Sequence, residues 1–204
     1  MDSNPIGIIG AGGHAKVVAA TLLDMGVKVE CLYDDDEMKW GGEVLGMGVH
    51  GPVQMLMERG TAQAIVAIGD NRSRKNISDE IKGVEWLTAV HPDVYVHSSV
   101  NVGCGTVVFA GAVIQPDVII GDHCIINTGT VIDHDCVIGS YAHIAPGVRL
   151  AGNVRIGLGT LVGIGSIVSP GISIGDNSVI GAGSVVVSDI PSNVTAYGVP
   201  ASVR

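Results

Sequence analysis

The chain has 204 residues, of which 47% are hydrophobic, and 20 acidic against 11 basic side chains give it a net charge of −9 at pH 7. High aliphatic content with few charges excludes a disordered chain, and an acidic chain without a basic stripe argues against nucleic-acid binding. No apolar run reaches the length of a membrane span, and Met1-Asp2-Ser3-Asn4 has neither a basic nor an apolar signal region.

The first 90 residues alternate short aliphatic runs with amphipathic stretches, a pattern typical of a Rossmann-like βαβ domain with a small parallel sheet. We expect strands at 6–9, 27–33 and 64–68, helices at 14–25, 52–59 and 72–82, and a closing strand at 86–90. The four cysteines (Cys31, Cys104, Cys124 and Cys136) have no CxxC spacing. We therefore expect no disulfide and no metal site, and the cytoplasm as the compartment.

A glycine loop joins the first strand to the first helix. The run from Gly10 to Ala15 fits the G-x-G-x-x-G/A pattern, whose backbone N–H groups suit a pyrophosphate. Asp34 and Asp35 end the second strand, near where an acidic residue meets a ribose in an NAD site. The motif alone favours a Rossmann oxidoreductase, but the module is too short for a full NAD domain. A loop kept only for tight strand–helix packing is the alternative interpretation.

Two arginines follow the third predicted strand. Arg72 and Arg74 could add charge against a diphosphate, or could simply be solvated on their helix.

A period of six residues begins at Val96. Every sixth residue from there to Val186 is aliphatic, without a break. Four positions later stand small or β-branched residues, among them Thr106, Ala112, Cys124, Thr130, Cys136, Ala142, Thr160, Ser166 and Ser184. Glycine directly follows the aliphatic residue at Gly103, Gly121, Gly139, Gly157, Gly163, Gly175 and Gly181. This pattern predicts a parallel β-helix, with the small residues pointing inward at the corners and the glycines in turns that need φ > 0.

The repeat resembles the left-handed β-helix of the hexapeptide acyltransferases. Three further features narrow the resemblance to the nucleotide-linked amino-sugar N-acetyltransferases: the Gly10–His14 module, the Gly69-Asp70-Asn71-Arg72 run and a helix without an interrupting loop. The most telling run is Ile126-Asn127-Thr128-Gly129-Thr130-Val131-Ile132-Asp133-His134-Asp135-Cys136. This subgroup includes enzymes acting on UDP-4-amino-4,6-dideoxy-N-acetylglucosamine and on GDP-perosamine, and the sialic acid O-acetyltransferases are nearby.

The resemblance implies two domains and an oligomer. Residues 1–90 would form a Rossmann-like nucleotide-sugar-binding domain, and residues 91–204 a left-handed parallel β-helix acetyltransferase domain. The protein would be a homotrimer with active sites between subunits. Acetyl-CoA would be a cosubstrate, with no tightly bound cofactor.

His134 is the best candidate for a general base, because an imidazole titrates near neutral pH and carboxylates stand on both sides of it. The alternative is that His134 is a solvated residue on a coil face without a catalytic role. In the resembled family, the residue after the catalytic histidine orients the imidazole, and here it is Asp135, where Glu is commoner. No Ser, Cys or Lys is placed to carry the acyl group, so we expect direct transfer.

The remaining site residues come from the resemblance. Asn127 matches a polar residue at the active site, although an Asn ladder capping a turn is the alternative. Matches to acetyl-CoA contacts are His143, Gly152 (whose N–H would serve the oxyanion), and Ile164 and Ala182 (through backbone atoms in the neighbouring subunit). Matches to the sugar-nucleotide site are Gly12, Gly13 and His14 at the diphosphate, Asp34 and Asp35 at the base or ribose, and Gly69 lining the pocket.

These residues imply acetyl transfer to the 4-amino group of a UDP- or GDP-linked 4-amino-4,6-dideoxy sugar, for a bacterial surface glycan or glycoprotein. The residues leave open which of the two bases is bound. Two alternatives stand beside this hypothesis: a sialic acid (or related sugar) O-acetyltransferase, and a non-catalytic sugar-nucleotide-binding partner of a synthase.

Overall fold

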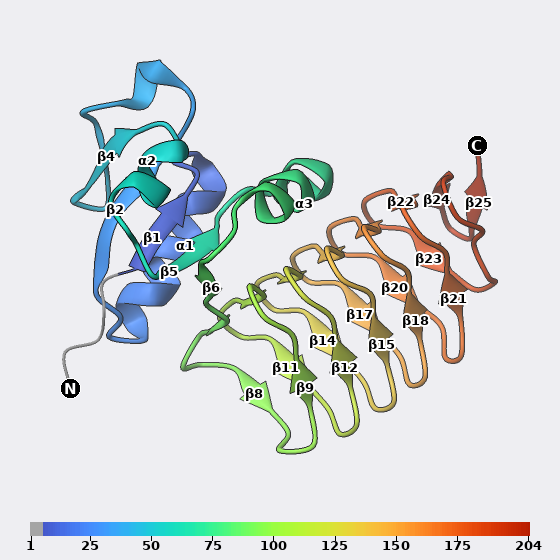
Figure 1. The fold of residues 1–204 in the computed structure, drawn as a ribbon. Coiled ribbons are helices and arrows are strands. Elements are labelled where there is room, and N and C mark those ends of the chain that lie inside the picture. The colour runs from blue at the N-terminus through green and yellow to red at the C-terminus, as the bar shows by residue number, and fades with distance from the viewer. Residues whose placement is uncertain (1–5) are drawn as a thin grey trace. The chain divides into compact units, whose positions relative to one another are not determined.

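The computed structural model describes residues 6–204, and the four N-terminal residues in which we predict no signal region lie outside that range. The chain divides into two compact units, Met1–Pro92 and Asp93–Arg204 (Figure 1). No helix within residues 6–204 is long and apolar enough to cross a membrane.

The first unit is built on a six-stranded sheet in the order β3-β4-β2-β1-β5-β6. Neighbouring strands are parallel except in the β3–β4 hairpin. Its strands are β1 (Ile6–Ile9), β2 (Val29–Tyr33), β3 (Glu43–Val44), β4 (Met47–Gly51), β5 (Gln63–Val66) and β6 (Glu85–Trp86), and the unit also contains β7 (Ala89–Val90). Its helices are α1 (Gly13–Asp24), the 3-10 turn η1 (Glu37–Lys39), α2 (Gln54–Glu58) and α3 (Asn71–Glu80).

The structure confirms the three predicted strands at 6–9, 27–33 and 64–68 and the three predicted helices, with ends shifted by one or two residues. The run at 86–90 is wrong as one strand, because it is divided into β6 and β7. The sequence patterns also miss η1 and the β3–β4 hairpin. Apolar residues from the ends of α3 and α2, including Ile77, Ile81 and Val53, pack on buried sheet residues such as Ile9 and Tyr33.

Parallel strands place their carboxyl ends at one edge of the sheet, which is where ligands bind in open α/β folds. The end of β1 leads into the glycine loop, β2 ends at Asp34 and Asp35, and β5 leads to Gly69. Because β1 lies between β2 and β5, all three segments meet at this edge.

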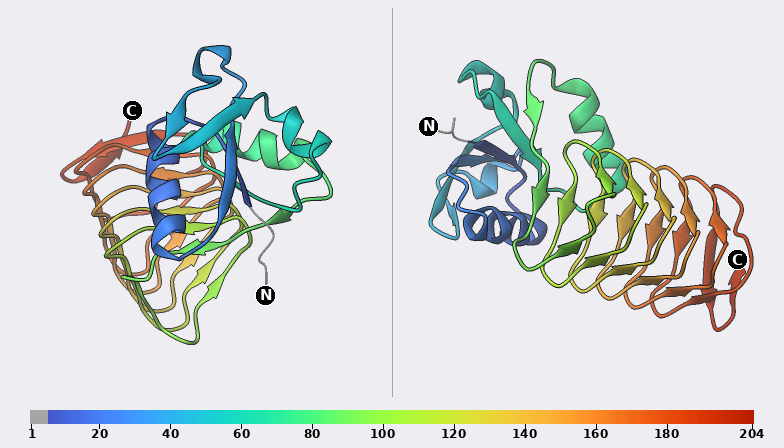
Figure 2. Two further views of the ribbon diagram at one scale, coloured as in Figure 1. Left: turned by 90° about the vertical axis from the view of Figure 1, so that its left-hand side faces the viewer. Right: turned by 90° about the horizontal axis from the view of Figure 1, so that it is seen from below.

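The second unit is a left-handed parallel β-helix (Figure 2). Strands eighteen residues apart pair in parallel, for example Val113 with Val131 and Val131 with Arg149. Its two-residue strands run from β8 (Tyr95–Val96) to β23 (Val185–Val186) at a strict spacing of six residues, and are β9 (Asn101–Val102), β10 (Val107–Val108), β11 (Val113–Ile114), β12 (Ile119–Ile120), β13 (Ile125–Ile126), β14 (Val131–Ile132), β15 (Val137–Ile138), β16 (His143–Ile144), β17 (Arg149–Leu150), β18 (Arg155–Ile156), β19 (Leu161–Val162), β20 (Ile167–Val168), β21 (Ser173–Ile174) and β22 (Val179–Ile180). The unit ends in the hairpin of β24 (Thr195–Gly198) and β25 (Ala201–Val203).

The strands form three faces of a prism. One face runs β8-β11-β14-β17-β20-β23, the second β9-β12-β15-β18-β21, and the third contains β10, β13, β16, β19 and β22. The aliphatic residue at every sixth position is buried throughout from Val108 to Val186. The predicted inward small residues are buried as well, and their hydroxyl or thiol groups donate to corner carbonyls, as Thr106 Oγ1 does to Gly121 O at 2.8 Å. Cys124 and Cys136 are packing residues of this kind, as predicted.

The predicted role of the glycines that directly follow the aliphatic position is wrong. Gly103 and Gly121 do not have positive φ; instead a Cβ on either would lie 2.5 or 2.6 Å from backbone atoms of the next coil. They are glycines because two coils approach closely there. The left-handed conformation occurs two residues further on, at each of the fourteen positions from Gly105 to Gly183, where eight residues are Gly and the others are Asp117, His123, Asp135, Tyr141, Asn153 and Asn177.

Candidate active site and nucleotide site

His134 and Asp135 occupy the turn that follows β14. His134 Nδ1 lies 2.7 Å from Asp135 Oδ2, and the side chains of both are more than half exposed. The neighbouring Asp133 accepts the His134 backbone N–H at 2.8 Å. With Asp135 accepting a hydrogen bond from Nδ1–H, the lone pair of the imidazole is on Nε2, as a general base requires.

The imidazole lies against the next coil. Gly152 stands eighteen residues after His134, in the turn that follows β17, and a Cβ at Gly152 would lie 2.7 Å from both Cε1 and Nε2 of His134. Only glycine leaves room for the ring at this distance. The Gly152 N–H donates no hydrogen bond to any residue in the described range, so it is available to an oxyanion beside the imidazole.

Two carboxylates raise the pKa of His134. The main cause is the hydrogen bond to Asp135, followed by the charge of Asp133, and together they outweigh the small effect of desolvation. A raised pKa stabilises the imidazolium that forms when the ring accepts a proton.

A second group of predicted residues lies along another edge of the prism. Asn127 follows β13 and His143 begins β16, which pairs with β13, so Asn127 Nδ2 and His143 Nε2 lie 3.2 Å apart. Ile164 and Ala182 occupy equivalent turns after β19 and β22 on the same face. Their N–H groups donate to no residue among 6–204.

The predicted residues of the β-helix are therefore divided between two edges. His134, Asp135 and Gly152, here called the His134 edge, follow strands of the face that contains β14. Asn127, His143, Ile164 and Ala182, here called the His143 edge, follow or lie on strands of the face that contains β16.

The glycine loop ends at the start of α1. Gly10 needs to be glycine, because its φ is +106° and a Cβ would lie 2.9 Å from Ala67 O. Gly12 is the N-cap of α1 and supplies no side-chain cap, whereas α3 is capped by Asp70, which accepts from Ser73 N at 2.8 Å. A Cβ on Gly12 or Gly13 would meet nothing within 4 Å. No N-cap side chain closes the start of α1, and the space beside Gly12 and Gly13 is open, an arrangement suited to a phosphate.

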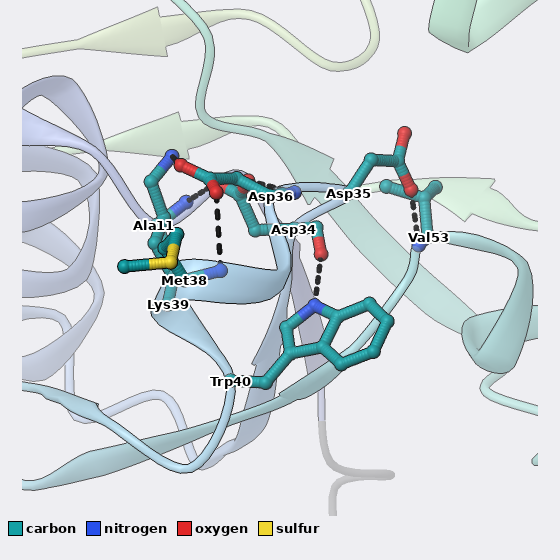
Figure 3. Close-up of polar contacts among 8 residues, drawn as sticks. All are labelled: Ala11, Asp34, Asp35, Asp36, Met38, Lys39, Trp40 and Val53. Carbon is teal, nitrogen blue, oxygen red and sulfur yellow. Dashed lines mark hydrogen bonds and ion pairs between the residues drawn. The ribbon is translucent and has the colours of Figure 1, made fainter.

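Asp34 holds the glycine loop in place (Figure 3). Its Oδ2 accepts the Ala11 N–H at 2.7 Å and the Lys39 ammonium at 2.9 Å, and its Oδ1 accepts the Asp36 N–H at 3.0 Å. Trp40 Nε1 donates to the Asp34 carbonyl at 2.7 Å. Burial raises the pKa of Asp34, but the hydrogen bonds from Lys39 and the two N–H groups outweigh it and lower the pKa overall. Sequence reasoning missed Lys39 and Trp40, which belong to the unpredicted turn η1 and its end.

Asp35 points away from this network. Its Oδ1 accepts the Val53 N–H at 2.9 Å, at the start of α2 (Figure 3).

His14 and Gly69 lie side by side, since a Cβ on Gly69 would be 4.0 Å from His14 Cγ.

Neither expectation for Arg74 holds. Its side chain is 1% exposed, and its guanidinium donates to Ile68 O at 3.0 Å, to Gly69 O at 3.2 Å and to Asn71 Oδ1 at 2.8 Å. Arg74 therefore holds the loop after β5 in place, because the first turn of α3 brings its guanidinium within hydrogen-bonding distance of the Ile68 and Gly69 carbonyls. The i, i+3 relation to Asn71 is the signal in the sequence that could have revealed it.

Comparison with known proteins agrees with this architecture. Residues 5–81 match the family of the PglD N-terminal domain. A histidine-to-asparagine variant of perosamine N-acetyltransferase from Caulobacter crescentus, in complex with CoA and GDP-perosamine, is 42% identical with a TM-score of 0.94, over 98% of this chain and 96% of that one. The acetyltransferase domain of PglB from Neisseria gonorrhoeae, in complex with acetyl coenzyme A, is 35% identical with a TM-score of 0.92, over 99% of this chain and 100% of that one.

An uncharacterized protein of Acanthamoeba polyphaga mimivirus is 35% identical over 110 residues, which are 54% of this chain and 22% of that protein. The chain thus spans about a fifth of this curated relative. The two solved structures, by contrast, match along almost their whole length and have the same two-part fold. Together with the sequence motifs, they show that the chain belongs to the nucleotide-linked amino-sugar N-acetyltransferases, acetyl-CoA-dependent enzymes of the left-handed β-helix class.

Proposed function

We propose that this chain transfers acetyl from acetyl-CoA to the 4-amino group of a UDP- or GDP-linked 4-amino-4,6-dideoxy sugar. The observation that carries the proposal is the His134 imidazole, which is hydrogen-bonded to Asp135 and packed against Gly152, whose N–H donates to no residue among 6–204. An acceptor amine needs a base, and a thioester carbonyl needs a donor for its oxyanion. Both groups stand side by side here.

The reaction proceeds in one transfer. The amine nitrogen attacks the thioester carbonyl carbon while its proton passes to His134 Nε2, and the oxyanion accepts a hydrogen bond from the Gly152 N–H. When the intermediate collapses, the C–S bond breaks and the CoA thiolate takes the proton from the imidazolium. Asp135 keeps the ring oriented and stabilises its charged form.

Acetyl-CoA binds to the His143 edge, where Asn127 and His143 form a polar pair and the N–H groups of Ile164 and Ala182 are open. Because the two edges follow different faces of one prism, we propose a homotrimer in which each site combines the His134 edge of one subunit with the His143 edge of its neighbour.

The sugar nucleotide binds at the carboxyl edge of the sheet. Gly12, Gly13 and His14 receive the diphosphate at the start of α1, beside Gly69. Asp35 lies on the side of the base, while Asp34 acts indirectly by holding the glycine loop. Acetyl-CoA and sugar nucleotides are cytoplasmic metabolites, so we place the enzyme in the cytoplasm, supplying a bacterial surface glycan or glycoprotein.

Acetylation of a panel of UDP-, GDP- and CMP-linked sugars, followed by mass spectrometry, tests the activity. We expect turnover with 4-amino sugars, and a loss of about 100-fold or more in kcat for His134→Ala. Turnover with hydroxyl acceptors alone would instead identify a sugar O-acetyltransferase. Unchanged pathway output with His134→Ala in cells would identify a non-catalytic binding partner.

Co-expression of two inactive variants tests the shared site. His134→Ala damages one edge and His143→Ala the other. In randomly mixed trimers, about one interface in four joins two intact edges, so about a quarter of the activity should return. Mixtures without activity would place each site within a single subunit.

A further inference from the structure

The first unit contains an open cavity of about 460 Å³ that the sequence patterns do not reveal. Its lining residues come from the end of β2, from α2 and from the last part of α3, and are Asp35, Val53, Gln54, Met57, Ile77, Glu80, Ile81 and Lys82. The volume is in the range of small-molecule sites. Because Asp35 belongs both to this cavity and to the predicted nucleotide site, the cavity adjoins the carboxyl edge where the diphosphate would bind.

The lining of the cavity suits a planar heterocycle. Val53, Met57, Ile77 and Ile81 supply apolar surface for its faces, and the other four lining residues, Asp35, Gln54, Glu80 and Lys82, supply polar groups for its edges. This combination of apolar walls and a small number of placed polar groups is typical of ligand sites, in which the polar groups decide which ligand is accepted.

Two carboxylates line the cavity, and we assign the selection of the ring to Asp35, which follows β2 at the carboxyl edge of the sheet, whereas Glu80 is the last residue of α3. Asp34 does not serve this purpose, since Ala11, Asp36 and Lys39 already occupy both of its oxygens. In Asp35, Oδ1 holds the Val53 N–H at 2.9 Å, and Figure 3 shows the second oxygen directed away from Val53. That oxygen accepts hydrogen bonds and cannot donate them.

We infer that this cavity binds the base of the sugar nucleotide and that Asp35 selects guanine over uracil, an inference that rests on the proposed function. Guanine presents two adjacent donors, N1–H and the 2-amino group, to a carboxylate. Uracil presents one N–H between two carbonyl oxygens, which a carboxylate repels. The ammonium of Lys82, also in the lining, suits the remaining guanine group, the O6 acceptor.

Titration calorimetry with GDP, UDP and xanthosine diphosphate tests the inference on the whole chain. We expect GDP to bind at least about 10-fold more tightly than UDP. Equal or tighter binding of UDP would overturn the inference.

Asp35→Asn gives a sharper test, because the amide oxygen can still accept the Val53 N–H while the amide nitrogen turns a donor toward the base. Xanthine has a carbonyl where guanine has its amino group. The variant should therefore lose at least about 10-fold in GDP affinity and gain affinity for xanthosine diphosphate. Asp36→Asn, one residue further and outside the cavity, should keep the wild-type order, and unchanged melting curves would show that both variants fold.

A parallel loss of all three nucleotides in Asp35→Asn, or the same change in Asp36→Asn, would refute the role of Asp35. The outcome for the proposed function is separate. Acetylation of a UDP-linked amino sugar with no preference for GDP would leave the N-acetyltransferase intact and remove only the guanine assignment. Binding of GDP without acetylation of any amino sugar would remove the proposed function instead.

Discussion

Replacing Gly152 by alanine tests whether the His134 imidazole works from the position in which the structure holds it. The new Cβ would lie 2.7 Å from Cε1 and Nε2 of His134, whereas ordinary contact begins near 3.4 Å, so the ring must move by roughly 0.7 Å. A misplacement of about 1 Å in a catalytic group can lower a rate about 100-fold. We therefore expect kcat to fall about 10- to 100-fold in steady-state assays. Stability should change little, because Gly152 does not have positive φ.

The double variant His134→Ala/Gly152→Ala is the control. Without the ring, the methyl group at residue 152 has nothing to displace, so it should not lower the residual rate of His134→Ala further. Full activity of Gly152→Ala would show that the position of the ring does not matter. An equal loss in both backgrounds would show that the alanine acts on another part of the site, and either result refutes the reasoning.

Three other predictions concern charge and burial. Asp133→Asn removes the charge that is the second cause of the raised pKa of His134, and it keeps an acceptor for the His134 backbone N–H. The acid limb of the kcat/KM profile should therefore move to lower pH. An unmoved limb would contradict the assignment of His134 as the general base. Arg74→Met removes the donor to the carbonyls of Ile68 and Gly69 and should lower the free energy of unfolding by about 1–3 kcal/mol in urea titrations. An unchanged free energy would mean that these hydrogen bonds do not stabilise the loop after β5. Because the pKa of Asp34 is lowered on folding, its contribution to stability is present above about pH 4 and lost as the pH falls. The melting temperature of Asp34→Asn should therefore depend less on pH below pH 4 than that of the wild type.

The β-helix could be predicted almost completely, because its rule is periodic and each coil repeats the same contacts. Residue spacing also indicates which site residues share an edge. Gly152 stands one coil of eighteen residues after His134, and Ala182 stands one coil after Ile164. The conformation of the turns could not be assigned from glycine alone. Glycine is required in this β-helix for two different reasons: two coils approach closely at Gly103, and the backbone has a left-handed φ at Gly105. A sequence does not distinguish these two reasons.

The first unit was harder to predict where local signals were weak. The β3–β4 hairpin turns at Leu45 and Gly46, both with positive φ, and Leu at the first of these positions is not the Asn or Asp that signals such a turn. One of the hydrogen bonds that Asp34 accepts comes from Lys39, which belongs to the unpredicted turn η1. A cavity between helices depends on how they pack, and no residue pattern in α2 or α3 specifies its size.

Asp135 lies where the demands of the fold and of catalysis coincide. Its φ is +58°, at the repeated left-handed position that Gly, Asp and Asn occupy in most coils. A short side chain that tolerates this conformation is favoured there. Asp135→Gly separates the two roles, because glycine meets the backbone demand and removes only the carboxylate.

We expect Asp135→Gly to match or exceed the wild type in thermal stability. Its kcat should fall about 10-fold or more, because the imidazole loses the partner that orients it. Its acid limb should move to lower pH, since the Asp135 hydrogen bond is the main cause of the raised pKa of His134. A variant that melts earlier and keeps its pH profile would mean that Asp135 serves the turn alone, and the orientation of His134 would then have to come from the Gly152 contact by itself.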